Sequence, residues 1–401
     1  MKRTWLLPSC VCAIVAALAL APAASVKGGI GDSIKKKVGD QTKKTGEAID
    51  KAAGTGEKAA SEKAGAESGS ESAPAGTGSG ASGNATKVSE VSTKFDFVPG
   101  DKLLFFDDFT QDELGEFPVK WNLAQGTYEV AEMNGERWLR CMSPDARIGM
   151  KLPEMAKLPE FWTLEYDFFL NDPPGSGILI RGLNPEEKYT WETSFPQGQD
   201  LAFRSGEIFS STPLEGSGNT GRHRLMLMAR GKALKVYIDR QRLANVPDIS
   251  LAAGMPKDFE FRMFSPSQPM ITNVRFAEGP QPAKDLLAEG KFVTYGIRFN
   301  TGSDVVLPES APILRQVASY LEANPTVKLA ITGHTDNVGT PASNLDLSKR
   351  RAASVAKVLS EQFGIAADRF TTDGKGDTQA VANNAKPEGR AMNRRVEFAK
   401  I

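Results

Sequence analysis

Histidine, cysteine and net charge are scarce in this chain of 401 residues, and each scarcity excludes a class of function. The 49 basic and 49 acidic residues give a formal net charge of zero, so no basic field attracts a nucleic-acid backbone. Nucleic acid is therefore not an expected partner. The only two histidines, His223 and His334, lie far apart in sequence, which leaves no His pair at the spacing of a zinc site. The sequence predicts neither a metal site nor a cofactor.

Long apolar runs are also missing, and the one near the N-terminus is too short to span a bilayer. Val11 to Leu20 follows a positively charged start and precedes Ala21-Pro22-Ala23, a small-residue cleavage site. Residues 1–23 are therefore predicted to be a cleaved signal peptide, which implies export to a periplasm. Cys141 is then the one thiol of the mature chain, and we expect it to be a buried apolar residue.

Aromatic residues are absent from residues 25–94, where Gly, Ala, Ser, Thr, Lys and Glu dominate. Such a segment cannot bury enough apolar surface to offset the entropy lost on ordering. Residues 24–94 are predicted to be a disordered tether.

Aromatic and β-branched residues return at Phe95, and residues 95–278 have the pattern of many short strands separated by turns. In Trp162 to Leu170, alternate residues place an aromatic and aliphatic set on one face and a mostly polar set on the other. The polar set includes Glu165 and Asp167, and we expect it to be solvated. The region is predicted to be an all-β sandwich of the jelly-roll kind.

After a linker predicted over residues 279–290, the pattern changes to alternating strands and helices over residues 291–401. Helices are expected at 308–324 and 344–363, and strands at 327–332 and 395–399. The order strand, helix, strand, helix, strand predicts a compact α+β domain with a βαβαβ layer.

The most specific string of this domain begins where a strand gives way to Gly333-His334-Thr335-Asp336. The next helix carries Leu347 and Arg351 on one face, four residues apart. An arginine on the inward face of that helix and an aspartate at the strand end form either an internal ion pair or the two halves of a ligand site. Spacing alone leaves both possibilities open, and His334 is interpreted as a loop-support residue.

Several ordered motifs of residues 291–401 resemble the OmpA-like C-terminal domain, the peptidoglycan-binding module of Gram-negative envelope proteins. They are Phe299-Asn300-Thr301-Gly302-Ser303, Gly333-His334-Thr335-Asp336, Asn344 to Val355, Gly374-Lys375-Gly376 and Asn393 to Glu397. The resemblance implies that Asp336 and Arg351 hold the diaminopimelate of the stem peptide. It further implies support from Thr335, Asn344 and an arginine of the pair Arg394 and Arg395.

The middle region is similar to the concanavalin A-like lectin and glucanase sandwich, through Phe106-Asp107-Asp108-Phe109 and Trp121 among other residues. That fold includes sugar binders, so Trp191, Tyr189 and Arg181 are candidates for a glycan site. One hydrolase branch uses the pattern Glu-x-Asp-x-x-Glu, which Glu165-Tyr166-Asp167 begins, but Leu170 stands at the third position. The missing carboxylate argues against an enzyme.

The sequence therefore predicts a non-catalytic envelope protein of the periplasm, associated with the outer membrane, that binds peptidoglycan through its C-terminal domain. The sandwich has no assigned ligand, and a glycan is its candidate. Two alternatives stay open. One is a glycan hydrolase carried by the sandwich and targeted to the wall, and the other is an outer-membrane barrel anchored to peptidoglycan.

Overall fold

The computed structural model describes most of the chain from residue 87 onward. The predicted signal peptide, and the predicted tether as far as residue 86, lie outside the described residues, as does most of the predicted linker. The described ranges are 87–91, 94–154, 157–171, 177–196, 201–212, 220–251, 253–264, 268–279, 287 and 289–401.

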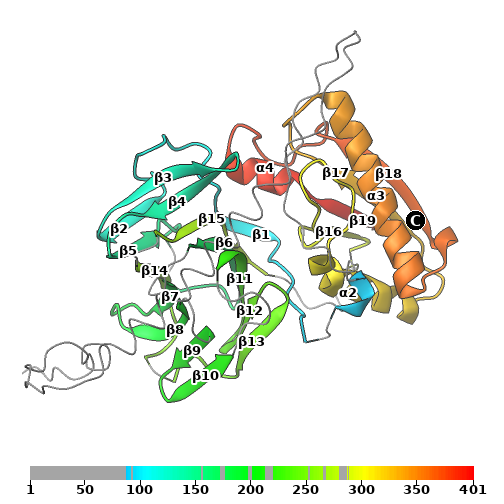
Figure 1. The fold of residues 1–401 in the computed structure, drawn as a ribbon. Coiled ribbons are helices and arrows are strands. Elements are labelled where there is room, and N and C mark those ends of the chain that lie inside the picture. The colour runs from blue at the N-terminus through cyan, green and yellow to red at the C-terminus, as the bar shows by residue number, and fades with distance from the viewer. Residues whose placement is uncertain are drawn as a thin grey trace, which may run out of the picture. The chain divides into compact units, whose positions relative to one another are not determined.

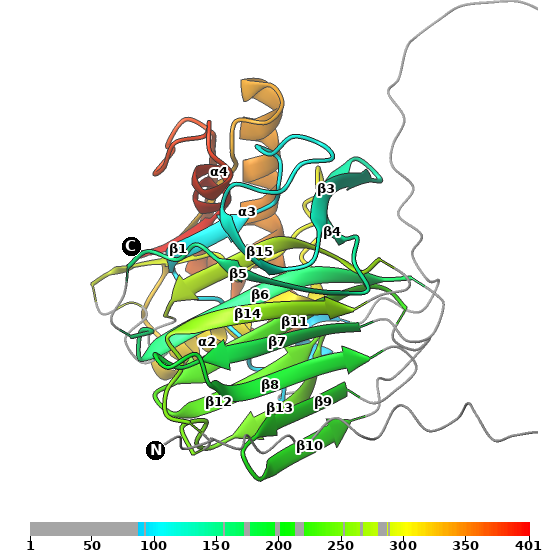
Figure 2. The same cartoon turned by 90° about the vertical axis from the view of Figure 1, so that its left-hand side faces the viewer.

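Two antiparallel sheets make up the region between residues 102 and 278, as Figures 1 and 2 show. Within the described residues, the first sheet has the order β13-β12-β11-β6-β15-β4-β3, with β1 also paired to β15. The second has the order β10-β9-β8-β7-β14-β5-β2. The strands are β1 (Lys102–Asp107), β2 (Trp121–Gln125), β3 (Tyr128–Met133), β4 (Glu136–Cys141), β5 (Asp145–Met150), β6 (Phe161–Leu170), β7 (Gly177–Leu183), β8 (Tyr189–Pro196), β9 (Leu201–Ser205), β10 (Ile208–Thr212), β11 (Gly221–Arg230), β12 (Ala233–Ile238), β13 (Gln241–Val246), β14 (Asp258–Phe264) and β15 (Met270–Glu278).

The core of the sandwich lies between the two sheets and follows the alternation expected for β6. Trp162 of β6 packs edge-on against Phe259 of β14, with ring centroids 5.2 Å apart. Tyr166 contacts Phe261 in the same way at 5.2 Å. Because β6 and β14 belong to different sheets, these rings join the two layers, and the predicted sandwich is confirmed. Cys141 is fully buried in this core, as expected.

The opposite face of β6 differs from the prediction. Glu165 is 0% exposed and Asp167 is 4% exposed, although a solvated face was expected. Two segments outside the sandwich strands cover this face. Gly100 donates its backbone N–H to Thr163 Oγ1 at 2.9 Å, and Arg298 of the C-terminal domain forms an ion pair with Glu165. The prediction failed because the cover comes from distant parts of the chain.

The C-terminal domain places helices against a four-stranded sheet with the order β16-β19-β17-β18. Strands β17 and β18 are parallel, whereas β19 runs antiparallel to both β16 and β17. The expected α+β architecture is confirmed, with β18 and α4 added to it. The elements are β16 (Lys291–Thr294), α2 (Ala311–Ala323), β17 (Leu329–His334), α3 (Pro341–Phe363), β18 (Phe370–Gly376), α4 (Pro387–Asn393) and β19 (Val396–Lys400), with short 3-10 turns at Pro308–Ser310 and Ala367–Arg369.

The chain before β1 packs into the C-terminal domain. The 3-10 turn η1 (Val88–Glu90) lies in the range predicted as tether, yet Val88 is only 3% exposed. Phe95 and Phe97 share one hydrophobic cluster with α2, α3 and Tyr237 of β12. Arg315 of α2 donates to the backbone oxygen of Phe95 at 2.7 Å. The described residues from 87 to 401 belong to one compact unit, so this cluster joins the sandwich to the C-terminal domain.

Candidate functional site

The candidate site lies where β17 ends and α3 begins, and two features bring these elements close together. At Gly333, an added Cβ would lie 2.3 Å from the backbone oxygen of Ser348, so only glycine permits this approach of strand and helix. Thr340 caps α3 by accepting from the backbone N–H of Ser343, in a reciprocal capping box. Helix α3 therefore starts three residues earlier than its expected first residue, Asn344.

Asp336 occupies the loop between these elements and is 9% exposed. Its Oδ1 accepts from the backbone N–H of Val338 at 3.1 Å, and its Oδ2 accepts from Arg394 Nη1 at 2.7 Å. Asn344 Nδ2 donates to the backbone oxygen of Asp336 at 3.2 Å, which fixes the loop on α3. A carboxylate has about four acceptor positions, so Asp336 can still receive a ligand cation.

Thr335 precedes Asp336 and is tied to β18 through its backbone. Its N–H donates to the oxygen of Gly376 at 3.0 Å. The side-chain Oγ1 of Thr335 is buried and has no hydrogen-bond partner within the part of the chain that the structure describes. A buried hydroxyl without a partner is uncommon in folded proteins.

Arg351 reaches from α3 to the loop that follows β16. Its Nε donates to the oxygen of Ser303 at 2.9 Å and its Nη2 to that of Asn300 at 3.2 Å. The guanidinium also lies over the Phe299 ring, 4.8 Å from its centroid. Burial lowers the pKa of Arg351, and the negative charge of Asp336 opposes that change. Its Nη1 has no hydrogen-bond partner among the described residues and is free to donate to a ligand anion.

The sequence left open an internal ion pair between Asp336 and Arg351, and the structure pairs Asp336 with Arg394 instead. Arg395 has a different environment from its neighbour. It is 5% exposed and donates to Glu397 Oε1 at 2.8 Å and to the backbone oxygens of Asn393 and Gln379. Of the two arginines, Arg394 therefore lies at the candidate site, and Arg395 holds the loop before α4 to the sheet.

His334 is the last residue of β17 and is 2% exposed. Burial and the charge of Arg395 lower the pKa of His334 to about 4, so the ring is neutral at pH 7. Neither ring nitrogen has a hydrogen-bond partner among the described residues, although Nε2 lies 3.6 Å from Glu397 Oε1. The backbone N–H of His334 donates to the oxygen of Arg395 at 3.0 Å.

The carboxylates of the half-motif in the sandwich, Glu165 and Asp167, are engaged in ion pairs. Glu165 is fully buried and forms ion pairs with Arg224, Arg275 and Arg298. Burial by itself raises the pKa of Glu165, but the charges of these arginines outweigh that effect and lower the pKa to about 2. A general acid holds a proton near neutral pH, whereas the surrounding arginines favour the ionised form of Glu165.

The predicted glycan-site residues of the sandwich are separated by the fold. Trp191 is 1% exposed and packs in the core against Phe203 and Phe259, so it is not a surface residue as expected. Tyr189 and Arg181 lie together, with the guanidinium 4.1 Å from the ring centroid. Arg181 also pairs with Glu192 and Glu260, so its donors are engaged within the sheet.

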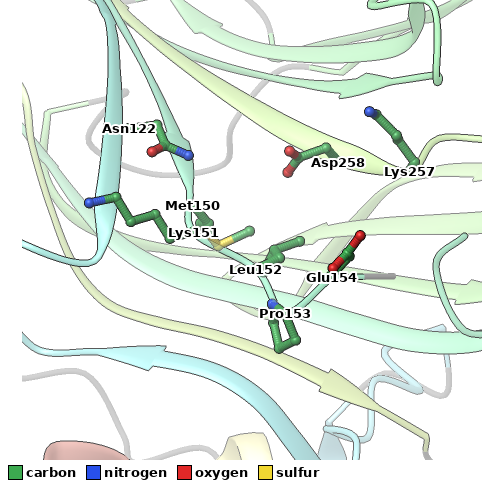
Figure 3. Close-up of a pocket in the computed structure, with 8 residues that line it drawn as sticks. All are labelled: Asn122, Met150, Lys151, Leu152, Pro153, Glu154, Lys257 and Asp258. Carbon is green, nitrogen blue, oxygen red and sulfur yellow. The ribbon is translucent and has the colours of Figure 1, made fainter. Parts of the chain in front are cut away.

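A hollow of about 330 Å³ opens elsewhere on the sandwich, near the ends of β2, β5 and β14, as Figure 3 shows. Its wall combines the apolar Met150 and Leu152 with charged side chains, among them Lys151, Lys257 and Asp258. None of the predicted site residues lines it. The hollow is therefore separate from the candidate site.

Within the described residues, no group of three or more His, Cys, Asp or Glu side chains is arranged to hold a metal ion. No helix in that part of the chain combines the length and the apolar character needed to cross a membrane.

Comparison with known proteins identifies the C-terminal part of the chain. Residues 298–394 match the model of the OmpA family. The peptidoglycan-binding protein ArfA of Mycobacterium bovis is 42% identical over 118 residues, which cover 29% of this chain and 36% of ArfA. Outer membrane porin F of Pseudomonas aeruginosa is 38% identical over 111 residues, 28% of this chain and 32% of the porin. The chain thus spans about a third of the length of these relatives.

Among solved structures, the chain is similar to the peptidoglycan-associated lipoprotein from Burkholderia pseudomallei. The two are 29% identical, with a TM-score of 0.25, and the match covers 29% of this chain and 92% of that one. The resemblance inferred from the motifs is confirmed by the family match.

Proposed function

Because the C-terminal part of the chain is an OmpA family domain, we propose that the protein binds peptidoglycan non-covalently through Asp336 and Arg351. The observation that carries this proposal is their geometry. An aspartate with spare acceptor positions and an arginine with a free Nη1 lie on adjacent segments, and each is held by its own backbone contacts. The relative named as peptidoglycan-binding supports the same conclusion.

The ligand that suits this pair is the diaminopimelate of the stem peptide, which presents an ammonium and a carboxylate on one carbon. Asp336 accepts from the ammonium, and Arg351 donates to the carboxylate. Arg394 restrains the Asp336 carboxylate, Asn344 holds the loop, and Thr335 supports it through the bond of its backbone N–H to Gly376. Arg395 is left out of the site because its donors are engaged in the fold.

A single site of this kind binds weakly. Each charge-assisted hydrogen bond contributes about 1.5 to 3 kcal/mol net, against the entropy lost on association. The wall is a polymer that repeats the same peptide, so a released molecule meets another site nearby. We propose that the protein is a non-catalytic component of the periplasm, associated with the outer membrane. A glycan ligand for the sandwich remains a hypothesis that Tyr189 and Arg181 support only by their proximity.

Co-sedimentation with peptidoglycan sacculi tests the proposal. Asp336→Asn and Arg351→Gln should each weaken binding about 10-fold or more, because each removes one charged partner of the zwitterion. Lys349→Ala is the matched control, since Lys349 is an exposed cation of the same helix that lies about 200° round from Arg351. It should bind as the wild type does. Circular dichroism establishes that each variant is folded.

A second comparison tests the ligand. Sacculi with lysine at the third stem position keep the side-chain ammonium and lack the carboxylate. The wild type should bind them less tightly than diaminopimelate sacculi, and the Arg351→Gln variant should bind both alike. Failure of the wild type to pellet, or pelleting that neither site substitution changes, would refute the proposed function.

A further inference from the structure

The buried charges on the outer face of β6 connect the sandwich to the C-terminal domain. Glu165 Oε2 accepts from Arg224 Nη2 at 2.7 Å and from Arg298 Nη2 at 2.5 Å, and its Oε1 accepts from Arg275 Nη1 at 3.3 Å. Arg224 and Arg275 belong to sandwich strands, whereas Arg298 belongs to the C-terminal domain. Glu165 is therefore a buried anion shared by the two domains.

Arg298 forms the base of the loop that holds Arg351. Its backbone oxygen accepts from Leu307 N–H at 2.9 Å, and a bridge between Phe299 and Val306 follows. The tip turns where Ser303 N–H donates to the oxygen of Asn300 at 3.0 Å. The Phe299 ring and the oxygens of Asn300 and Ser303 are the groups that contact the Arg351 guanidinium.

A second contact between the domains lies at α4, whose residues precede Arg394. Arg390 Nη2 donates to Thr110 Oγ1 at 2.8 Å and lies 3.8 Å from Asp108. Glu388 pairs with Lys120 of the sandwich at 2.5 Å. Arg394, which follows α4, donates its backbone N–H to the oxygen of Arg390 at 3.1 Å. In Figure 1, α4 lies next to β1 of the sandwich.

The contacts made by Arg298 and by α4 each immediately precede a segment that forms the candidate site. Arg298 leads into the loop that contacts Arg351, and α4 leads into the arginine that pairs with Asp336. We propose that the sandwich acts as a positioning element for the peptidoglycan site, with Arg298 and Arg390 as the positioning residues. This inference rests on the proposed function and deepens it, because it gives the middle domain a role in wall binding that needs no ligand of its own.

The experiment compares sacculus binding by the full chain and its Arg298→Met, Arg298→Lys and Arg390→Met variants. Arg298→Met removes the pairing with Glu165 but keeps an unbranched side chain, whereas lysine restores the positive charge. Arg222→Met is the matched control, because Arg222 pairs with the buried Asp167 and with Glu136 and contacts sandwich residues in both ion pairs. Circular dichroism and urea unfolding establish that each variant is folded under the binding conditions.

We expect Arg298→Met and Arg390→Met each to weaken binding about 3- to 10-fold, within the range of residues that act through a neighbouring group. The loss should be partial, because Asp304 of the same loop also pairs with Arg350 of α3 at 2.7 Å. Lysine at position 298 should restore part of the affinity, and Arg222→Met should bind as the wild type does. Rescue by lysine distinguishes positioning from a general loss of stability.

Hydrogen exchange provides a readout that does not depend on binding. Amides of residues 299–305 should exchange faster in Arg298→Met than in the wild type or in Arg222→Met. Unchanged exchange there, or wild-type affinity in both folded positioning variants, would overturn the inference. Lack of binding by the wild type would refute the proposed function instead, and the exchange rates would still decide whether Arg298 positions the loop.

Discussion

The buried carboxylate of Glu165 provides the sharpest quantitative test of how the two domains are joined. Glu165→Gln keeps the volume of the side chain but removes the charge that pairs with Arg224, Arg275 and Arg298. Removing one partner of a buried ion pair costs about 3 to 5 kcal/mol, because the remaining charge has no compensation. The pKa of Glu165 leads to a similar free energy. A fall of this pKa from 4.5 to about 2 on folding corresponds to a stabilisation of about 3 kcal/mol.

The pH dependence of this stabilisation has a definite sign. A carboxyl group whose pKa is lower in the folded state contributes its full stabilisation above the unfolded pKa, here 4.5. The contribution is lost as the pH falls toward the folded pKa of about 2. At pH 3.5 about 1 kcal/mol of it should be gone. Glutamine does not titrate, so the difference in stability between wild type and variant should narrow over this range.

Urea unfolding followed by tryptophan fluorescence measures the difference, because Trp121, Trp138 and Trp162 are all buried in the sandwich. Glu129→Gln is the control, since Glu129 pairs with Arg140 at a partly exposed position and should cost less than about 1 kcal/mol. The reasoning would be refuted if Glu165→Gln cost no more than this control. A difference that stays constant between pH 7 and pH 3.5 would also refute it.

Two further predictions concern the C-terminal domain. His334 has a pKa of about 4 in the folded protein against 6.5 in the unfolded chain, so the unfolded chain binds a proton first as the pH falls. The free energy of unfolding of the wild type should therefore fall by about 2 kcal/mol between pH 7 and pH 4.5. Urea unfolding at the two pH values should show a smaller fall in the free energy of unfolding for His334→Gln. Equal falls in the two proteins would contradict the lowered pKa of His334. Arg395→Gln should lower the free energy of unfolding by about 2 to 4 kcal/mol, because it leaves buried acceptors without a donor. Arg394→Gln should change stability by less than about 1 kcal/mol but weaken sacculus binding. If Arg394→Gln instead lowered the stability and Arg395→Gln weakened sacculus binding, the roles of the two arginines would be exchanged.

Elements with a strong local pattern were predicted correctly from the sequence. The alternation in Trp162 to Leu170 identified the buried face of β6, because side chains on a strand alternate regardless of what lies beyond it. The periodicity that predicted helices at 308–324 and 344–363 is an equally local signal, and α2 and α3 cover most of these ranges. Strand β18 was missed because its sequence, Phe-Thr-Thr-Asp-Gly-Lys-Gly, has no apolar alternation and much of it is exposed.

The arrangement of the candidate site could be predicted in part. The order of motifs placed Asp336 and Arg351 in one region, and both lie within the residues that match the family. The order of motifs did not show which of Arg394 and Arg395 lies at the site, because two adjacent arginines differ only in the groups that surround them. Nor did it indicate Arg298, whose partner Glu165 lies 133 positions away in the sequence.

The amino-acid sequence by itself determined the sandwich core, the α+β character of the C-terminal domain and the family of that domain, because these depend on periodicity and on the order of nearby motifs. Only the tertiary structure decided that Glu165 is buried, that Asp336 pairs with Arg394, and that the segment before β1 packs into the C-terminal domain. The environment of a charge depends on every group that folding brings near it. Such groups come from anywhere in the chain, so no local pattern records them.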